Sequence, residues 1–167
     1  MKILLLEDEL MLNNAISEYL KNIGHMVESF SDGQEVLDNI NNTYDLLILD
    51  INVPTKDGFE ILSELNNKKI YIPTIFISAL IDIEDISKAY SLGCREYIKK
   101  PFHLGELGIK INQILKKEQN NTTHIKFSEN YSYSKDKQTL YFNGEPQSLT
   151  KKQLEIVHIL ALNINMI

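Results

Sequence analysis

The sequence has little of what secreted and membrane-spanning proteins need. It contains one cysteine, Cys94, so no intrachain disulfide can form. Its first residues, MKILLLEDE, end the apolar run with three acids before the apolar core of a signal peptide is complete. The longest apolar stretch, IYIPTIFISALI, contains Pro73 and is shorter than the roughly 20 residues of a membrane-spanning helix. These absences predict a soluble protein of the reducing cytoplasm, with no membrane partner.

The chain also has little positive charge. Its formal net charge is −6, and the acidic excess lies within residues 1–118. Because that part should repel a phosphate backbone, we expect any contact with nucleic acid to involve the remaining residues. With 167 residues, of which 43% are hydrophobic, the chain has room for one α/β domain and part of a second.

Short apolar runs alternate with amphipathic segments through the first two thirds of the chain. Runs bounded by turn or cap residues predict β-strands at 2–6, 25–30, 45–49, 71–77 and 95–98. The segments between and after them predict helices, one along the stripe from Leu12 to Ile23 and others at 32–40, 57–67, 83–92 and 102–117. Apolar strands joined by helices require a parallel sheet covered on both faces. The sequence therefore predicts an α/β, doubly wound (βα)5 fold of the flavodoxin-like class.

A polar segment at 119–123 separates this pattern from a different one. It lacks apolar periodicity and predicts a linker between a domain at 1–118 and a second one at 124–167. Four short runs in the second part predict antiparallel strands, with Asn143-Gly144 as a hairpin turn. Thr150 is the predicted N-cap of a helix at 151–162. The buried side of that helix is predicted to consist of Leu154, Val157 and either Leu160 or Ala161.

Charged and hydroxyl side chains gather where the predicted strands end. They are Glu7, Asp8 and Glu9 after the first strand, Asp50 after the third, Ser78 after the fourth and Lys100 after the fifth. In a doubly wound sheet the ligand site lies beyond the carboxyl ends of the strands, so these groups should converge. Converging carboxylates repel each other unless a divalent cation lies among them, and oxygen ligands favour Mg²⁺. We therefore predict a magnesium site at this edge.

Asp50 is the predicted acceptor of a phosphoryl group at this site. A carboxylate at the end of a central strand, facing the metal, is best placed for in-line attack. The cation, the ammonium of Lys100, the hydroxyl of Ser78 and backbone N–H groups would hold the transferred group.

Each charged residue taken alone has a simpler interpretation. Asp8, Glu9 and Asp57 are candidates for helix N-caps, and Lys100 for a solvated surface lysine. Their joint placement after successive strands favours a functional site, because such a cluster is rarely built without charge compensation.

Four segments resemble, in order and at family spacing, the motifs of the response-regulator receiver domain. They are LLLEDE, DLLILDINVPTKDGFEIL, TIFISAL and GCREYIKKPF, within residues 1–118. The resemblance implies that Asp50 takes its phosphoryl group from the phosphohistidine of a sensor histidine kinase. It also implies a set of Mg²⁺ ligands, namely Glu7, Asp8, Asp50 and the backbone carbonyl of Asn52.

The same resemblance implies roles for the groups around Asp50. Lys100 would pair with the phosphate, and Ser78 would turn inward to bond it. Tyr97 would be the switch aromatic that rotates inward as Ser78 moves. The Lys100-Pro101 bond corresponds to one that is cis in the family. Such a domain is a phosphorylation switch and not an enzyme, apart from its own phosphorylation and dephosphorylation.

Residues 124–162 resemble the start of the winged-helix effector domain of the OmpR/PhoB family. The match covers the four-strand platform and the first helix, and the sequence ends before the positioning helix, the recognition helix and the wing. We therefore do not expect this incomplete effector part to read DNA directly, although the family controls transcription. The alternative is a stand-alone receiver that acts by protein contact. Without packing partners, the helix at 151–162 is expected to be mobile or to supply an intermolecular contact.

Active dimers of the family form through the fourth helix, the fifth strand and the fifth helix. Glu96 and Lys110 are a candidate pair for such a homodimer, whereas Arg95 and Ile86 stand where an acid and a base are usual. The same residues also fit a solvated surface.

Two further kinds of chemistry are disfavoured. A hydrolase that forms an aspartyl-phosphate needs a second acid two residues after the nucleophile, where this chain has Asn52. The four histidines show no metal-ligand spacing, and Cys94 follows Gly93 where a small residue is needed. We predict structural or surface roles for the histidines and a packing role for the cysteine.

Overall fold

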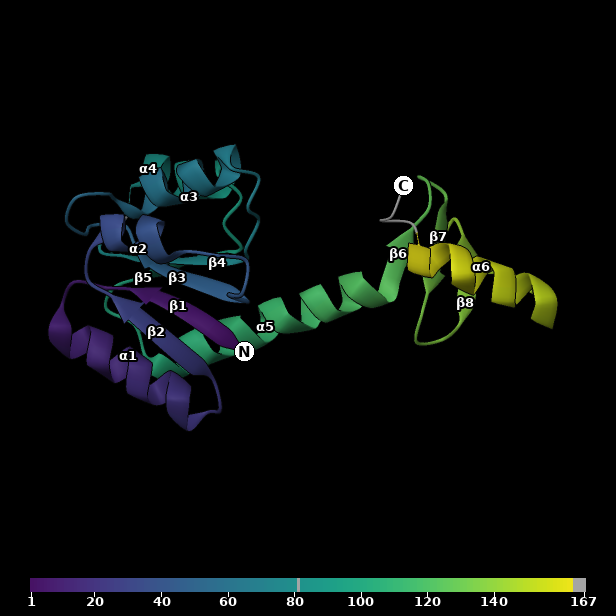
Figure 1. Cartoon of the computed structure of the whole chain (residues 1–167), viewed down its shortest axis with the longest axis horizontal. Helices are drawn as coiled ribbons and strands as arrows, with labels where there is room; N and C mark the ends of the chain where they lie inside the picture. The colour runs from purple at the N-terminus through teal and green to yellow at the C-terminus, as the bar shows by residue number, and fades with distance from the viewer. Residues whose placement is uncertain (81, 164–167) are drawn as a thin grey trace. The chain divides into compact units, whose positions relative to one another are not determined.

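The computed structural model describes residues 1–80 and 82–163, without the side chains of 117–124, 162 and 163. The chain forms two compact units, which divide between Asn112 and Gln113 inside helix α5 (Leu104–Thr123). Each unit has a sheet of its own (Figure 1).

The first unit is built on a parallel sheet. Its strands are β1 (Lys2–Leu6), β2 (Met26–Phe30), β3 (Leu46–Asp50), β4 (Thr74–Ser78) and β5 (Glu96–Lys99). They are ordered β2-β1-β3-β4-β5, and every neighbouring pair is parallel. The predicted doubly wound sheet is thereby confirmed. Its winding direction reverses between β1 and β3, which is the place where such sheets bind ligands.

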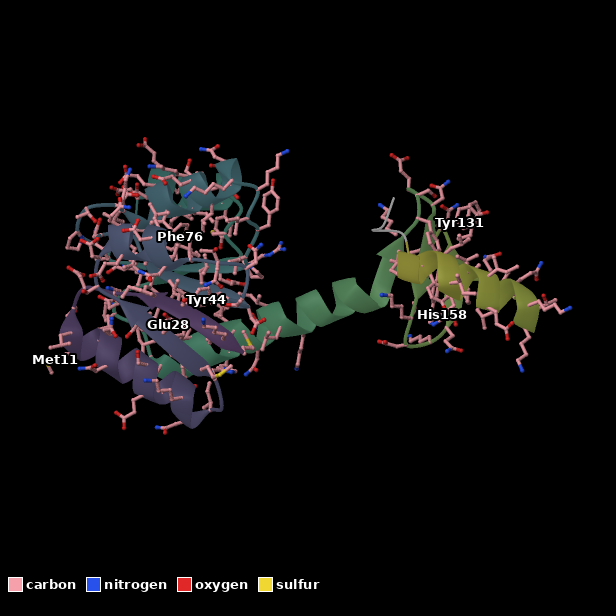
Figure 2. The ribbon with its side chains drawn as sticks, viewed as in Figure 1. Met11, Glu28, Tyr44, Phe76, Tyr131 and His158 are labelled. Atoms are coloured by element: carbon pink, nitrogen blue, oxygen red, sulfur yellow. The ribbon has the colours of Figure 1, made fainter. Side chains whose placement is uncertain are left out.

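Helices cover both faces of this sheet. Besides α5 they are α1 (Leu10–Asn22), α2 (Gly33–Asn39), α3 (Gly58–Asn67) and α4 (Ile83–Ser91). Figure 1 shows α1 and α5 on one face and α2, α3 and α4 on the other. Alternate strand residues, among them Leu4, Leu47 and Phe76, are fully buried in the core cluster beneath the second set of helices (Figure 2). This two-sided burial explains why the interior residues of β1, β3 and β4 are apolar without alternation, with polar residues only at the strand ends.

Short polar motifs start two of these helices. The side chain of Asp57 accepts a hydrogen bond from Glu60 N at 2.7 Å, and Glu60 Oε2 accepts one from Asp57 N at 3.0 Å, which forms a capping box at α3. Asp32 caps α2 through bonds from Gln34 N and Glu35 N. The cap interpretation of Asp57 is therefore confirmed, whereas Glu9, at the N-cap position of α1, makes no side-chain cap bond.

Two predicted boundaries were wrong. The fourth strand begins at Thr74 and not at residue 71, directly after Pro73, which has no N–H to give to a ladder. Helix α5 continues to Thr123, so residues 119–123, predicted as a linker, are helical. No glycine or proline occurs between Gly108 and Thr123 to end the helix.

The second unit contains an antiparallel sheet and a helix. The strands are β6 (His124–Lys126), β7 (Tyr131–Ser134), β8 (Thr139–Phe142) and β9 (Glu145–Pro146), followed by α6 (Lys151–Asn163). Asn143 and Gly144 have φ of 49° and 85°, as the predicted hairpin turn requires.

Helix α6 begins with a capping box and buries Ala161. Thr150 and Gln153 bond reciprocally, since Thr150 N donates to Gln153 Oε1 at 2.9 Å and Gln153 N donates to Thr150 Oγ1 at 3.5 Å. Ala161 is 2% exposed and Leu160 is 59% exposed, so Ala161 is the one of the two that is buried. Throughout the described residues, no helix combines the length and apolar character needed to cross a membrane.

Candidate functional site

Three carboxylates meet where β1 and β3 end. Glu7 and Asp8 follow β1, and Asp50 is the last residue of β3. One carboxylate oxygen from each lies within 4.8 Å of the other two. Glu7 is fully buried and Asp50 is 3% exposed, whereas Asp8 is open to solvent. The convergence predicted from the ends of the strands is therefore present at the switch point of the sheet.

The ammonium of Lys100 lies between two of these carboxylates. Its Nζ is 2.6 Å from Asp50 Oδ2, 2.9 Å from Glu7 Oε1 and 2.7 Å from Glu7 Oε2. The Lys100 side chain is 17% exposed, so the interpretation as a solvated surface lysine was wrong. The backbone before it is held by a bond from Lys100 N to Ser78 O at 2.7 Å. The predicted cis peptide bond between Lys100 and Pro101 is confirmed.

Burial and charge shift the acid–base equilibria of this cluster. Burial is the largest cause of a raised pKa at Glu7; the Asp50 charge adds to it, and Lys100 opposes it. Burial alone would lower the pKa of Lys100, but its bonds to Asp50 and Glu7 outweigh that effect and raise the pKa. The site therefore holds an ammonium against carboxylates that are poorly solvated.

The carboxylates have unused capacity for a cation. Glu7 Oε2 is buried and, although it lies 2.7 Å from Lys100 Nζ, accepts no hydrogen bond of acceptable geometry among the described residues. Asp8 offers a solvent-facing carboxylate within the same cluster. An oxygen-only set with an unsatisfied buried member fits a hard divalent cation.

Ser78 and Tyr97 are connected through one residue of the loop after β4. Ser78 Oγ accepts a hydrogen bond from Leu80 N at 3.0 Å, and Tyr97 OH donates one to Leu80 O at 2.9 Å. Burial raises the pKa of Tyr97, against the opposing effect of a hydrogen bond from Ser78. The two predicted switch residues are thus linked to each other, and the bond of Ser78 is directed to the loop.

The loop between β3 and α3 leaves the site through Asn52. Asn52 N donates to Asp50 Oδ1 at 3.0 Å. Farther along, Thr55 has a φ of 64°, in the left-handed region, and its hydroxyl bonds Asp32 at the start of α2 at 2.6 Å. Sequence reasoning missed this pair, because a β-branched residue disfavours that backbone and its partner is distant in sequence. The one available signal was Asp32-Gly33 preceding a helix.

Two other expectations concerned residues outside this cluster. Cys94 is 6% exposed, and burial raises the pKa of its thiol to about 11, which confirms a packing role. His158 Nδ1 lies 2.9 Å from the hydroxyl of Tyr133, a fully buried residue of the second unit (Figure 2). This contact agrees with a structural role for that histidine.

Residues 3–112 match the family model of the response regulator receiver domain. This chain belongs to the response regulator family. The transcriptional regulatory protein RprY of Bacteroides fragilis is 32% identical over 169 residues, which cover 99% of this chain and 72% of the relative. CiaR of Streptococcus pneumoniae, also a transcriptional regulatory protein, is 30% identical, with 99% of this chain and 74% of the relative covered.

Solved structures place this response regulator in the OmpR/PhoB group. DrrB of Thermotoga maritima, an OmpR/PhoB homologue, superposes with a TM-score of 0.64 at 25% identity, covering 97% of this chain and 72% of DrrB. The non-phosphorylated HemR receiver domain of Leptospira biflexa superposes with a TM-score of 0.65 at 30% identity, covering 68% of this chain and 93% of that domain. The chain is therefore a two-component response regulator with a flavodoxin-like receiver, followed by an antiparallel sheet and a helix that are consistent with a winged-helix effector domain.

Proposed function

We propose that this response regulator is switched by a phosphoryl group that Asp50 accepts from the phosphohistidine of a sensor histidine kinase. The observation that carries the proposal is the position of the Asp50 carboxylate. It ends the central strand β3, is 3% exposed, and lies 2.6 Å from the Lys100 ammonium and within the carboxylate cluster of Glu7 and Asp8. A carboxylate so placed meets both a cation site and a fixed positive charge.

Magnesium is the cofactor that fits this cluster. Glu7, Asp8 and Asp50 would hold it together with the backbone carbonyl of Asn52. When bound, Mg²⁺ supplies positive charge that offsets the negative charge of the carboxylates and of the incoming phosphoryl oxygens. The unsatisfied buried oxygen of Glu7 and the open carboxylate of Asp8 support this assignment.

The transfer itself needs little from the protein beyond positioning. An oxygen of Asp50 forms a bond to phosphorus while the bond from phosphorus to the kinase histidine nitrogen breaks, and the electron pair of that bond stays on the imidazole. Lys100, now bonded to Asp50 Oδ2 at 2.6 Å, would exchange that contact for a phosphoryl oxygen. The domain forms and loses its own acyl phosphate and turns over no other substrate, so we do not class it as an enzyme.

Ser78 and Tyr97 would report the phosphorylated state. The Ser78 hydroxyl would donate its proton to a phosphoryl oxygen on Asp50, and the inward turn of the side chain would disturb the hydrogen bond that its oxygen now accepts from Leu80 N at 3.0 Å. The carbonyl of that same residue holds Tyr97 OH at 2.9 Å, so the loop and the tyrosine would respond together. Inward rotation of Tyr97 would change the surface formed by α4, β5 and α5.

The output we propose is transcriptional control. Both curated relatives described above are named as transcriptional regulatory proteins, and the second unit has the four-strand platform followed by a helix. Contact with DNA would require a complete effector domain with a recognition helix. A receiver that acts through protein contact alone is the competing function.

A homodimer through α4, β5 and α5 belongs to this proposal as its assembled form. The charges differ from the usual pattern, since Arg95 and Ile86 stand where an acid and a base are expected. In this structure Lys110 Nζ bonds Glu96 Oε2 within the chain at 2.8 Å. The exposed apolar side chains Ile83 and Ile109, 81% and 61% exposed, offer a contact of a different kind at this face.

Labelling with acetyl phosphate and Mg²⁺ tests the proposal. Intact-protein mass spectrometry should show one added phosphoryl group on the wild type and none on Asp50→Ala, whereas Asp38→Asn, which alters an exposed carboxylate on α2, should label normally. Undiminished labelling of Asp50→Ala contradicts the assignment. Multiple turnover of a phosphoester, without a stable adduct, would instead indicate a hydrolase.

A further inference from the structure

The loop that carries Asn52 contains a strained residue. Thr55 has a φ of 64°, and a β-branched side chain in the left-handed region is a genuine outlier that strains the backbone. Such strain persists only where surrounding contacts determine the backbone. Thr55 lies three residues after Asn52, with the rigid ring of Pro54 between them.

The side chain of Thr55 is fastened to the start of α2. Thr55 Oγ1 lies 2.6 Å from Asp32 Oδ1 and 2.8 Å from Pro54 O, and its single proton is best given to the carboxylate. The same Oγ1 accepts a hydrogen bond from Gln34 N at 3.1 Å. Asp32 Oδ1 also accepts from Gln34 N at 2.8 Å, so one carboxylate oxygen both caps α2 and holds the loop.

The backbones of the two loops are in direct contact as well. Gly33 N donates to Pro54 O at 3.2 Å. A Cβ at Gly33 would lie 1.9 Å from the carbonyl oxygen of Lys56, so only glycine permits this approach. We call the combined contacts of Asp32 and Gly33 with residues 54–56 the α2 clamp.

The loop is thereby held at both ends. At its start, Asn52 N bonds Asp50 Oδ1 at 3.0 Å and Val53 N bonds Ile51 O at 3.2 Å. At its far end the α2 clamp fixes the backbone of Thr55. The Asn52 carbonyl therefore belongs to a segment with little freedom left to lose when a ligand binds, and a preorganised ligand binds more tightly.

We propose that Asp32 and Thr55 are positioning residues for the Asn52 carbonyl, so that the α2 clamp sets the magnesium affinity of the site. This inference rests on the proposed function, in which that carbonyl is a metal ligand. Neither residue touches the phosphoryl group. The clamp acts before the reaction, by ordering the loop when the protein folds.

Thr55→Val is the informative substitution, because it keeps the side-chain shape and removes the hydroxyl. Asp32 and Thr55 are solvent-accessible, so the hydrogen bond between their side chains contributes less than a buried one. We therefore expect the Mg²⁺ affinity of Thr55→Val to fall about 3- to 10-fold. Thr55→Ser restores the hydroxyl and should return the affinity toward the wild-type value. Thr55→Gly removes the strain together with the clamp, and it too should bind Mg²⁺ more weakly.

The measurement is the Mg²⁺ dissociation constant from calorimetry, together with the initial rate of labelling by acetyl phosphate at low and at saturating Mg²⁺. Thr43→Val is the matched control, because it removes a hydroxyl that bonds Asn41 before β3 starts. For the clamp variants the labelling rate should be slow at low Mg²⁺ and near normal at saturation. That split distinguishes positioning from general damage, which lowers both rates.

Three results separate this inference from the function on which it rests. If the wild type neither binds Mg²⁺ nor labels at Asp50, the proposed function fails. If the wild type does both and Thr55→Val binds Mg²⁺ as tightly as Thr43→Val, the clamp inference is wrong while the function stands. If Thr55→Gly binds Mg²⁺ as tightly as the wild type, the Thr55 hydroxyl only offsets the strain of its own left-handed backbone, and the positioning role is again refuted.

Discussion

Replacing Lys100 by methionine should destabilise the receiver in a way that depends on pH. The ammonium lies 2.6 Å from Asp50 Oδ2 and 2.7 Å from Glu7 Oε2, and the two carboxylate side chains are 5% and 0% exposed. Methionine has a similar length and no charge. The variant therefore keeps most of the packing and leaves two adjacent carboxylates without their cation.

The size of the effect follows from burial. Removing one partner of a buried ion pair costs about 3–5 kcal/mol, and because Lys100 is 17% exposed we expect the lower end, about 3 kcal/mol at neutral pH without Mg²⁺. A domain typically has about 5–15 kcal/mol of stability, so the variant should still fold.

The sign of the pH dependence comes from Glu7. Burial raises its pKa in the folded state, and loss of Lys100 removes an opposing effect and raises it further. A group whose folded pKa lies above its unfolded value stabilises the protein below the unfolded pKa, and this contribution is lost as pH rises through the folded pKa. The loss of unfolding free energy in Lys100→Met should therefore be small near pH 4.5, the ordinary pKa of a glutamate, and grow as the pH rises to neutrality. Mg²⁺ should restore part of the loss.

Urea unfolding followed by circular dichroism, over this pH range with and without Mg²⁺, measures the effect. Lys99→Met is the control, since that neighbouring lysine is exposed and should show little change at any pH. A Lys100→Met deficit that is absent at neutral pH, or equal at every pH, would refute the electrostatic account of the site.

Three further outcomes follow from the geometry. Gly58→Ala would place a Cβ 2.6 Å from the backbone oxygen of Asp50, so it should lower the free energy of unfolding by about 1–3 kcal/mol and slow labelling by acetyl phosphate. Gly105→Ala, which has open space around its Cβ, should change neither urea unfolding nor labelling. Tyr44 OH donates a hydrogen bond to Glu28 at 2.7 Å, and burial raises the pKa of Tyr44 to about 12 (Figure 2). Tyr44→Phe should therefore lower the free energy of unfolding by about 1 kcal/mol in urea titrations at neutral pH. This difference from the wild type should disappear as the pH rises from 10 to about 12, because the folded pKa lies above the unfolded value. Mg²⁺ at 100 times its dissociation constant should stabilise the wild type by about 2.7 kcal/mol in the same titrations, and a chelator should reverse the gain; an unchanged midpoint would argue against metal binding.

Much of the receiver could be predicted because its strands have a simple physical signature. A strand such as β3 is buried on both faces, so its sequence LLILD is apolar without alternation, and the acid that ends it must lie at the ligand-binding edge. The contact between Lys100 and Glu7 spans 93 positions of sequence, yet it follows once both are assigned to that edge.

Other features could not be predicted for equally physical reasons. The extension of α5 past residue 118 adds polar residues that favour helix and linker about equally, so periodicity gives no signal there. The left-handed backbone of Thr55 runs against its local preference and depends on Asp32, a partner 23 positions away. The choice of Ala161 over Leu160 as the buried residue depends on how α6 meets its own sheet.

The link between Ser78 and Tyr97 has an unusual genetic consequence. Both hydrogen bonds use the main chain of Leu80, one through its N–H and the other through its carbonyl. Truncating the leucine side chain removes neither bond, so an alanine scan would pass over the connection. Proline at this position deletes the donor and is the natural substitution that would expose it. Selection on this link therefore acts on the backbone of residue 80, whereas its leucine side chain, which packs against the core cluster, is constrained separately.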